Sequence, residues 1–328
     1  MNDPRTFTHA QPQVVQEFPL ASMYNPPYLT KLRSVILPLM TAARIDPLEP
    51  KMHRVCRELN DGFKDQGHCD VVADFARKYA IAIFGDLYGL PVEGREEFRQ
   101  MAETYLHGDT EQQAAWTSIR RLMQDELEAR RRSPQEDILN GIAHGQMDGE
   151  LIDIDLAVNL SSTLFLGGLD TLPSNIGWTL RYLAEHPEHR QRIVENPSCI
   201  PTAVEEFFRV FPAVARNGGT ATRDVHFHGV DIRAGDRVVS MLCLANQDSA
   251  VFEDPTILDF DRQVNKHMAF GAGAHRCLGS HLARHELGVA LQEWHAAIPD
   301  YRIASSENRT YAGGMVFGIE SLPMEWDV

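Results

Sequence analysis

The stretch FGAGAHRCLGSHLAR, from Phe270 to Arg284, carries the most specific pattern in this sequence. A glycine-rich turn holds a single cysteine, Cys277, and a helix-like run follows it directly. The other four cysteines are widely spaced and form no CxxC pair, so neither a disulfide framework nor a zinc ribbon is indicated. The stretch therefore points to a role for one particular thiol.

Four roles are possible for this loop. An isolated intracellular cysteine is most often a buried free thiol. A phosphate-binding loop is disfavoured, because the third glycine of a GxGxxG motif would fall on Arg276 and no βαβ pattern surrounds it. A zinc site is suggested by Cys277, His281 and His285, which recur every four residues along one stripe of an expected helix, although no fourth ligand is evident. A haem site is suggested because a thiolate gains from the free N–H groups at a helix N-terminus.

The loop resembles the haem-binding loop of the cytochrome P450 family, which has a phenylalanine, two glycines, a basic residue, the ligand cysteine, a glycine and a downstream Leu-Ala-Arg. The resemblance implies that Cys277 is the axial ligand of the iron of haem b, where thiolate donation favours cleavage of the O–O bond. Phe270 would shield the sulfur, and Gly271, Gly273 and Gly279 would let the backbone approach the macrocycle. His275 would contact a haem propionate.

Two arginines are further candidates for the propionates. Arg33, in KLR, matches a propionate-binding arginine of the family. The family's later propionate-binding arginine falls on a glycine here, and Arg216 is the candidate substitute.

A second motif, LFLGGLDTLPSN, lies in a long apolar stretch that predicts one helix from about Leu151 to His186. Taken alone, Asp170 and Thr171 are most simply a polar pair in an apolar helix that forms hydrogen bonds with a neighbouring element. The resemblance implies instead the family's oxygen-binding groove, in which Thr171 holds oxygen and its water network and Asp170 relays protons as a general acid. Pro173 cannot donate to the carbonyl of Leu169, so the helix should kink there.

The third motif, AVEEFFRVFP, places Glu206 and Arg209 three residues apart, a spacing typical of an ordinary solvated pair. In the family this is a buried ExxR pair joined by a later arginine, here Arg262, and its role is structural.

The first 210 residues read mostly as helix, and alternating apolar and polar residues after Arg209 predict short strands. We therefore expect a mainly α fold with a small β portion. The resemblance implies one haem-thiolate domain over 1–328 with the cytochrome P450 fold, most like the bacterial camphor-hydroxylase branch. It also leads us to expect a chain that is shortened at its N-terminus, with strand edges left open.

The implied activity is that of a monooxygenase, which inserts one oxygen atom from O₂ into a C–H bond of a small apolar molecule such as a terpenoid. Electrons would come from NAD(P)H through a reductase and a [2Fe–2S] ferredoxin. The open alternatives are a haem-binding protein with little or no turnover and a zinc-stabilised structural protein. The resemblance supplies these substrate-pocket candidates: Thr163, Leu166, Gly167, Val214, Met315 and Val316.

The charge of −15, from 46 acidic and 31 basic residues, argues against a general nucleic-acid binder. The N-terminus has no apolar signal region, and the longest apolar run, Leu156 to Leu169, is too short to cross a bilayer. We expect a cytoplasmic protein with no membrane or nucleic-acid partner. Lys31, Arg33, Arg276 and Arg284 are candidate contacts for an acidic ferredoxin, and a homo-oligomer is a further expectation to test.

Overall fold

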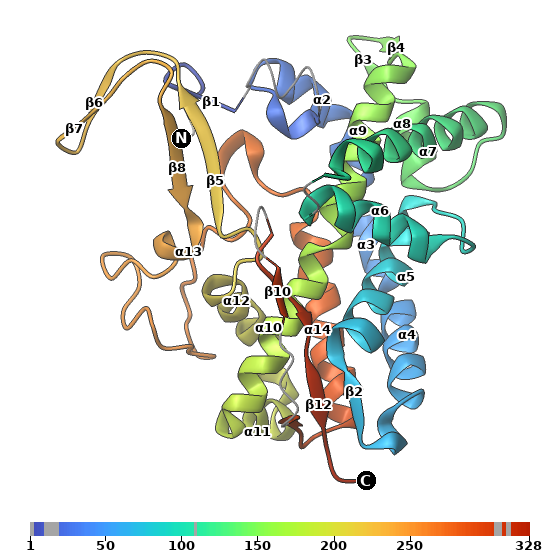
Figure 1. Ribbon diagram of the computed structural model, residues 1–328, viewed down its shortest axis with the longest axis vertical. Helices are drawn as coiled ribbons and strands as arrows, with labels where there is room; N and C mark the ends of the chain where they lie inside the picture. Colours follow the sequence, from blue (N-terminus) through green and yellow to red (C-terminus); the bar gives the residue numbers. More distant parts are fainter. Residues whose placement is uncertain (1–2, 10–19, 108–109, 305–309, 313–315) are drawn as a thin grey trace.

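Helices make up most of the protein, and a ribbon of strands stands beside them (Figure 1). The computed structural model describes residues 3–9, 20–107, 110–304, 310–312 and 316–328. Within them the α-helices are α2 (Tyr28–Ile36), α3 (Ala42–Ile45), α4 (Glu49–Asp61), α5 (Arg77–Tyr88), α6 (Arg95–His107), α7 (Gln112–Arg132), α8 (Ile138–Ala143), α9 (Ile154–Leu169), α10 (Thr171–Glu185), α11 (Pro187–Glu195), α12 (Ile200–Val210), α13 (Leu242–Ala245) and α14 (Ser280–Ala297).

The strands are short and form small antiparallel sheets. They are β1 (Phe7–Thr8), β2 (His68–Asp70), β3 (Gln146–Met147), β4 (Glu150–Leu151), β5 (Arg216–Ala221), β6 (Val225–Phe227), β7 (Val230–Ile232), β8 (Arg237–Met241), β9 (Arg302–Ile303), β10 (Thr310–Ala312), β11 (Gly318–Ser321) and β12 (Pro323–Glu325). The largest sheets have the orders β1-β5-β8 and β2-β12-β9, while β3-β4, β6-β7 and β10-β11 are two-stranded. Near the C-terminal end, β10 pairs with β11, whereas β12 pairs with β2 and β9.

The core gathers around α14, which packs along α4 and also contacts α10 and α12. Trp294 on α14 is fully buried and meets the ring of Phe75 edge-on, with 5.2 Å between ring centres. Large aromatic side chains bury much apolar surface, so this contact fixes the C-terminal half of α14 against the N-terminal half of the chain. The N-terminal end of α14 is thereby held in place for the loop that precedes it.

The long helix expected from Leu151 to His186 is present as two helices, α9 and α10, with a break at Asp170. Asp153 caps the start of α9 by accepting a hydrogen bond of 2.7 Å from the backbone N–H of Leu156. The break lies where Pro173, in the first turn of α10, cannot donate to the preceding turn. Pro187 then opens α11, so the second helix ends at Glu185.

These elements confirm the expectation of a mainly helical fold with a small β portion. No helix in the described ranges combines the length and the apolar character needed to cross a membrane.

Candidate functional site

The backbone before α14 folds into a tight loop around Cys277. Gly271 and Gly273 adopt left-handed conformations with φ of 65° and 64°, which a residue with a side chain rarely takes. The N–H of Cys277 donates to the carbonyl of Phe270 at 2.8 Å and so closes the loop. Gly279 follows as the N-cap residue of α14, and this places the thiol just before the helix N-terminus.

The surroundings of Cys277 pull its pKa in opposite directions. Burial among protein atoms raises the pKa of the thiol, while the N–H of Gly279 and the guanidinium groups of Arg33, Arg284 and Arg276 act to lower it. The side chain is nevertheless solvent-accessible, and accessibility decides whether a ligand can reach it. A ligand can thus reach the sulfur although protein atoms surround it, and the nearby N–H group and guanidinium groups favour the thiolate.

Arg33 and His275 lie beside this thiol. Arg33, on α2, donates to the carbonyl of Arg276 at 2.7 Å, so α2 is bound directly to the cysteine loop. His275 packs against His9, with 4.1 Å between the ring centres. Burial, followed by the nearby His9 and Arg33, lowers the pKa of His275 to about 4. His275 is therefore neutral at pH 7 and retains one N–H to donate to a carboxylate.

Phe270 is fixed by two contacts at the start of the loop. Its ring lies 4.7 Å from that of Phe208 on α12, and the guanidinium carbon of Arg284 lies 4.5 Å from its ring centre. Arg284 also pairs with Glu205 on α12, which accepts a second hydrogen bond from the ring of His267 at 3.0 Å. Burial opposes ionisation, but His267 and Arg284 lower the pKa of Glu205 to about 2.

Glu205 and His9 are not among the site residues predicted from the sequence. Glu205 precedes Glu206 in AVEEFF, and a helix places adjacent residues on different faces. The sequence could therefore have indicated that Glu205 has a different partner from Glu206. His9 reaches the site because β1 pairs with β5, a long-range contact without a local sequence signature.

The two glycines of the second motif have different surroundings. A Cβ at Gly167 would meet no heavy atom within 4 Å, whereas one at Gly168 would lie 2.3 Å from the ring of Phe84. Gly167 is exposed although most of α9 is buried. Of the two, only Gly167 thus borders open space. Position 168 needs a glycine because the ring of Phe84 occupies the space that a side chain would fill.

Asp170 and Thr171 occupy the break between α9 and α10. The hydroxyl of Thr171 donates to the carbonyl of Gly167 at 3.1 Å, and the carbonyl of Asp170 accepts from Ser174. Both side chains are half-buried. The hydroxyl of Thr171 is thereby held next to the open side of Gly167.

The remaining pocket candidates are placed in several environments. Leu166 and Val316 are buried and Val214 is half-buried. The hydroxyl of Thr163 accepts from the N–H of Ala21 at 2.8 Å and donates to Asn159, so it holds the turn at Ala21. Met315 lies outside the described residues.

Arg216 opens β5 opposite Met241, and its side chain is exposed. In the described part of the chain, its backbone pairs with β8 and not with the cysteine loop.

The ExxR residues form one buried network. Glu206 and Arg209 are completely buried and joined by hydrogen bonds of 2.7 and 2.8 Å. Arg262 donates to Glu206 at 2.9 Å, and Arg209 also donates to the carbonyls of Asn246, Pro255 and Ile257. Burial opposes ionisation of Glu206, but these partners hold its pKa below the ordinary value. The network fastens α12 to the segment that leads into the cysteine loop.

The zinc alternative with Cys277, His281 and His285 as ligands was wrong in its geometry. It assumed a helix through all three residues, but α14 begins at Ser280, after the cysteine. Among the described residues, the metal-ligand group that includes the two histidines takes Asp46 in place of Cys277.

The residues of the loop and of α9 fit a haem. Cys277 offers an accessible thiol of the soft type that binds iron, and Arg33 and the neutral His275 beside it are suited to carboxylates. Gly167 supplies a stretch of backbone that a flat group can approach.

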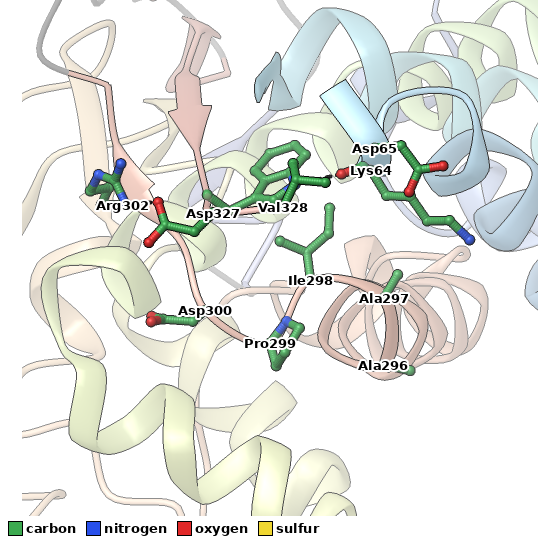
Figure 2. A pocket seen from close by; sticks show the side chains of 11 residues that line it. Lys64, Asp65, Ala296, Ala297, Ile298, Pro299, Asp300, Arg302, Asp327 and Val328 are labelled. Atoms are coloured by element: carbon green, nitrogen blue, oxygen red, sulfur yellow. Dashed lines mark hydrogen bonds and ion pairs between the residues drawn. The ribbon is translucent and has the colours of Figure 1, made fainter. Parts of the chain in front are cut away.

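A separate cleft of about 440 Å³ lies at the other end of α14 (Figure 2). Ala297, Asp300 and Asp327 line it, and Arg302 is paired there with Glu325 and Asp327. Because α14 has 18 residues and rises about 1.5 Å per residue, this cleft is far from Cys277. It is not part of the candidate site.

Comparisons with known proteins agree with this geometry. The family model described as Cytochrome P450 matches residues 198–294. The chain is 33% identical to probable cytochrome P450 127A1 of Sinorhizobium fredii, covering 92% of this chain and 73% of the relative. It is also 33% identical to nocardicin C N-oxygenase of Nocardia uniformis subsp. tsuyamanensis, covering 96% of this chain and 82% of the relative.

Solved structures give the same result. The crystal structure of CYP101J2 superposes with a TM-score of 0.91 at 31% identity, covering 100% of this chain and 85% of the other. CYP101C1 gives 0.91 at 30% identity, covering 100% and 84%. Both support the expected likeness to the camphor-type branch. The chain therefore belongs to the cytochrome P450 family, and it is a P450-type monooxygenase whose cofactor is haem b.

Proposed function

We propose that this enzyme inserts one oxygen atom from O₂ into a C–H bond of a small apolar substrate such as a terpenoid. The observation that carries the proposal is the accessible thiol of Cys277, which receives the N–H of Gly279 and lies beside Arg33. The second oxygen atom leaves as water after two electrons and two protons are taken up. The substrate class is supported by the apolar side chains of Leu166, Val214 and Val316.

The roles that we propose for individual side chains follow from their chemistry. When bound, the haem supplies O₂ binding and activation of the O–O bond. Cys277 would bind its iron, while Arg33 and His275 would bind its propionates. Asp170 would deliver protons as a general acid, and the hydroxyl of Thr171 would orient the water that carries them. The break at Asp170 supports this assignment, because it keeps both side chains at an interruption of a buried helix.

We propose a [2Fe–2S] ferredoxin and its NAD(P)H-dependent reductase as the electron source. Of the basic contact candidates, Lys31 pairs with Asp148 and Arg284 pairs with Glu205. Arg276 is exposed next to the cysteine, and it is the best placed of the group to meet an acidic partner. A cytoplasmic location, the single domain and the oligomeric state stay predictions, the last measurable by sedimentation velocity.

The decisive experiment is the absorption spectrum of the haem-loaded protein after reduction and addition of carbon monoxide. We expect the long-wavelength Soret band typical of a thiolate-bound haem, and we expect Cys277→Ser to lose it. A wild-type protein without this band would overturn the assignment of Cys277. Product formation driven by NADH through a ferredoxin pair then separates a monooxygenase from a haem-binding protein without turnover.

A further inference from the structure

Two histidines on the first turns of α14 converge on one carboxylate from a distant part of the chain. His281 and His285 are four residues apart on the helix, and Asp46 opens the 3-10 turn η3 (Asp46–Leu48) before α4. Their ligand atoms all lie within 4.8 Å of one another. Imidazoles four residues apart on one helix face are a common pair of ligands for zinc.

The distances within this group suit a tetrahedral ion. The Nε2 atom of His281 lies 2.7 Å from Oδ1 of Asp46, and Nε2 of His285 lies 3.7 Å from the same oxygen. Ligand atoms about 2.0–2.1 Å from a tetrahedral ion are roughly 3.3 Å apart, between these two separations. A hydrogen bond explains the first contact, but the second is too long for one.

A second carboxylate, that of Glu49, lies near His285. Oε2 of Glu49 lies 3.5 Å from Nδ1 of His285, the ring nitrogen that does not face Asp46. Ligand histidines usually direct their other N–H at such a carboxylate, which fixes the ring and its tautomer. Asp46 and Glu49 thus bring two carboxylates to the imidazoles of His281 and His285, and this combination of ligands suits a divalent transition-metal ion.

The site is open to solvent. The side chains of His281, Asp46 and His285 are 39%, 54% and 27% exposed, so an ion can enter without any rearrangement of the core. Three protein ligands leave one position for water.

We propose that Asp46, His281 and His285 form a binding site for a divalent transition-metal ion, with zinc as the preferred occupant, and that Glu49 orients His285. The ion ties the start of α14, just after the cysteine loop, to the segment before α4. This site does not involve Cys277, and it does not depend on the proposed reaction.

The test is calorimetric titration of the haem-loaded protein with Zn²⁺, in which Cys277 is held by the iron. We expect one Zn²⁺ per chain, and we expect His281→Asn and His285→Asn each to weaken binding by about tenfold or more. The matched control is His226→Asn, which removes a single exposed histidine that pairs with Asp231 at 2.6 Å. It should leave the titration unchanged.

Two further readouts keep the test independent of folding defects. Asp46→Asn should also weaken Zn²⁺ binding, while the reduced carbon monoxide spectrum of every variant stays that of the wild type. Anomalous diffraction at the zinc edge should place the ion between the three side chains. Absence of a one-to-one titration, unchanged binding in both α14 variants, or a peak elsewhere would overturn the proposal.

Discussion

The hydroxyl of Thr171 donates a hydrogen bond of 3.1 Å to the carbonyl of Gly167. Thr171→Ala removes this hydroxyl and leaves the cysteine loop untouched. We expect the carbon monoxide spectrum to persist while consumption of NADH is diverted from product to hydrogen peroxide. The measurement is the ratio of product to NADH consumed.

Thr171→Ser is the matched control, because it keeps a hydroxyl at the same position. We expect Ser to restore most of the product ratio that Ala loses. An alanine variant with undiminished coupling would contradict the proton-delivery role of Thr171.

Gly167 and Gly168 allow a paired test of their different surroundings. Gly168→Ala places a Cβ 2.3 Å from Phe84, and such overpacking costs about 1–3 kcal/mol of unfolding free energy. Gly167→Ala meets no atom within 4 Å, and alanine is favoured over glycine in a helix by roughly 1 kcal/mol. Urea unfolding of both variants, measured before haem is added, should thus show a loss for the first and none for the second. Equal losses would contradict the open space at Gly167.

Individual residues differ in how far the sequence could predict them. Cys277 and its glycines form a local pattern, so the loop was readable without a structure. The partner of His275 was not, because His9 arrives through pairing of β1 with β5. The roles of Gly167 and Gly168 also differ only because Phe84 packs from another helix.

The network that fastens α12 to the segment before the cysteine loop predicts a large cost for its disruption. Glu206→Gln leaves Arg209 buried with a weaker partner, and breaking a buried pair costs roughly 3–5 kcal/mol. Urea unfolding measures this loss. Glu58→Gln is the control, since Glu58 and Arg54 form an exposed pair at 3.8 Å and should matter little.

The link between α12 and α14 through Glu205 should make stability depend on pH. Because the pKa of Glu205 is lowered from 4.5 to about 2, the folded state binds fewer protons than the unfolded state between these values. Its contribution is therefore full above the ordinary pKa and is lost as pH falls towards 2.

Glu205→Gln tests this dependence. At pH 7 the variant should lose roughly 1.5–3 kcal/mol of unfolding free energy, the range for hydrogen bonds to charged groups. The difference from wild type should shrink as the pH is lowered below 4.5. A constant difference across that range would contradict the ionised state of Glu205.

The sequence predicted that helices are present, but it predicted less well where each helix begins and ends. Apolar periodicity indicated the region of α9 and α10 as one helix, and Pro173 indicated its irregularity. The zinc site with Cys277, His281 and His285 was predicted wrongly because a four-residue spacing places residues on one face only within a helix. Cys277 precedes α14, which begins at Ser280. The small sheets were less predictable, because β12 pairs with β2 and β9 from distant segments.

Considered as a whole, the enzyme carries a charge of −15, which repels an acidic ferredoxin except near local cations. Arg276→Gln removes an exposed cation next to Cys277. We expect a slower ferredoxin-driven reduction with an unchanged carbon monoxide spectrum. The difference from wild type should fade with salt, since the screening length drops from about 10 Å at 0.1 M to about 3 Å at 1 M.

Arg302→Gln is the control for this prediction. Arg302 is also exposed but lies at the opposite end of α14, where it pairs with Glu325. Its loss should not alter ferredoxin-driven reduction; equal effects of both variants would indicate a general charge effect and not a docking contact.

The packing of α14 on α4 has a consequence for how the enzyme is made. Residues 49–61 leave the ribosome long before residues 280–297, yet the core around Trp294 needs both helices. The thiol at residue 277 therefore gains its fixed position only after translation has passed α14. We therefore expect haem to bind the polypeptide only after α14 has been synthesised and has packed on α4.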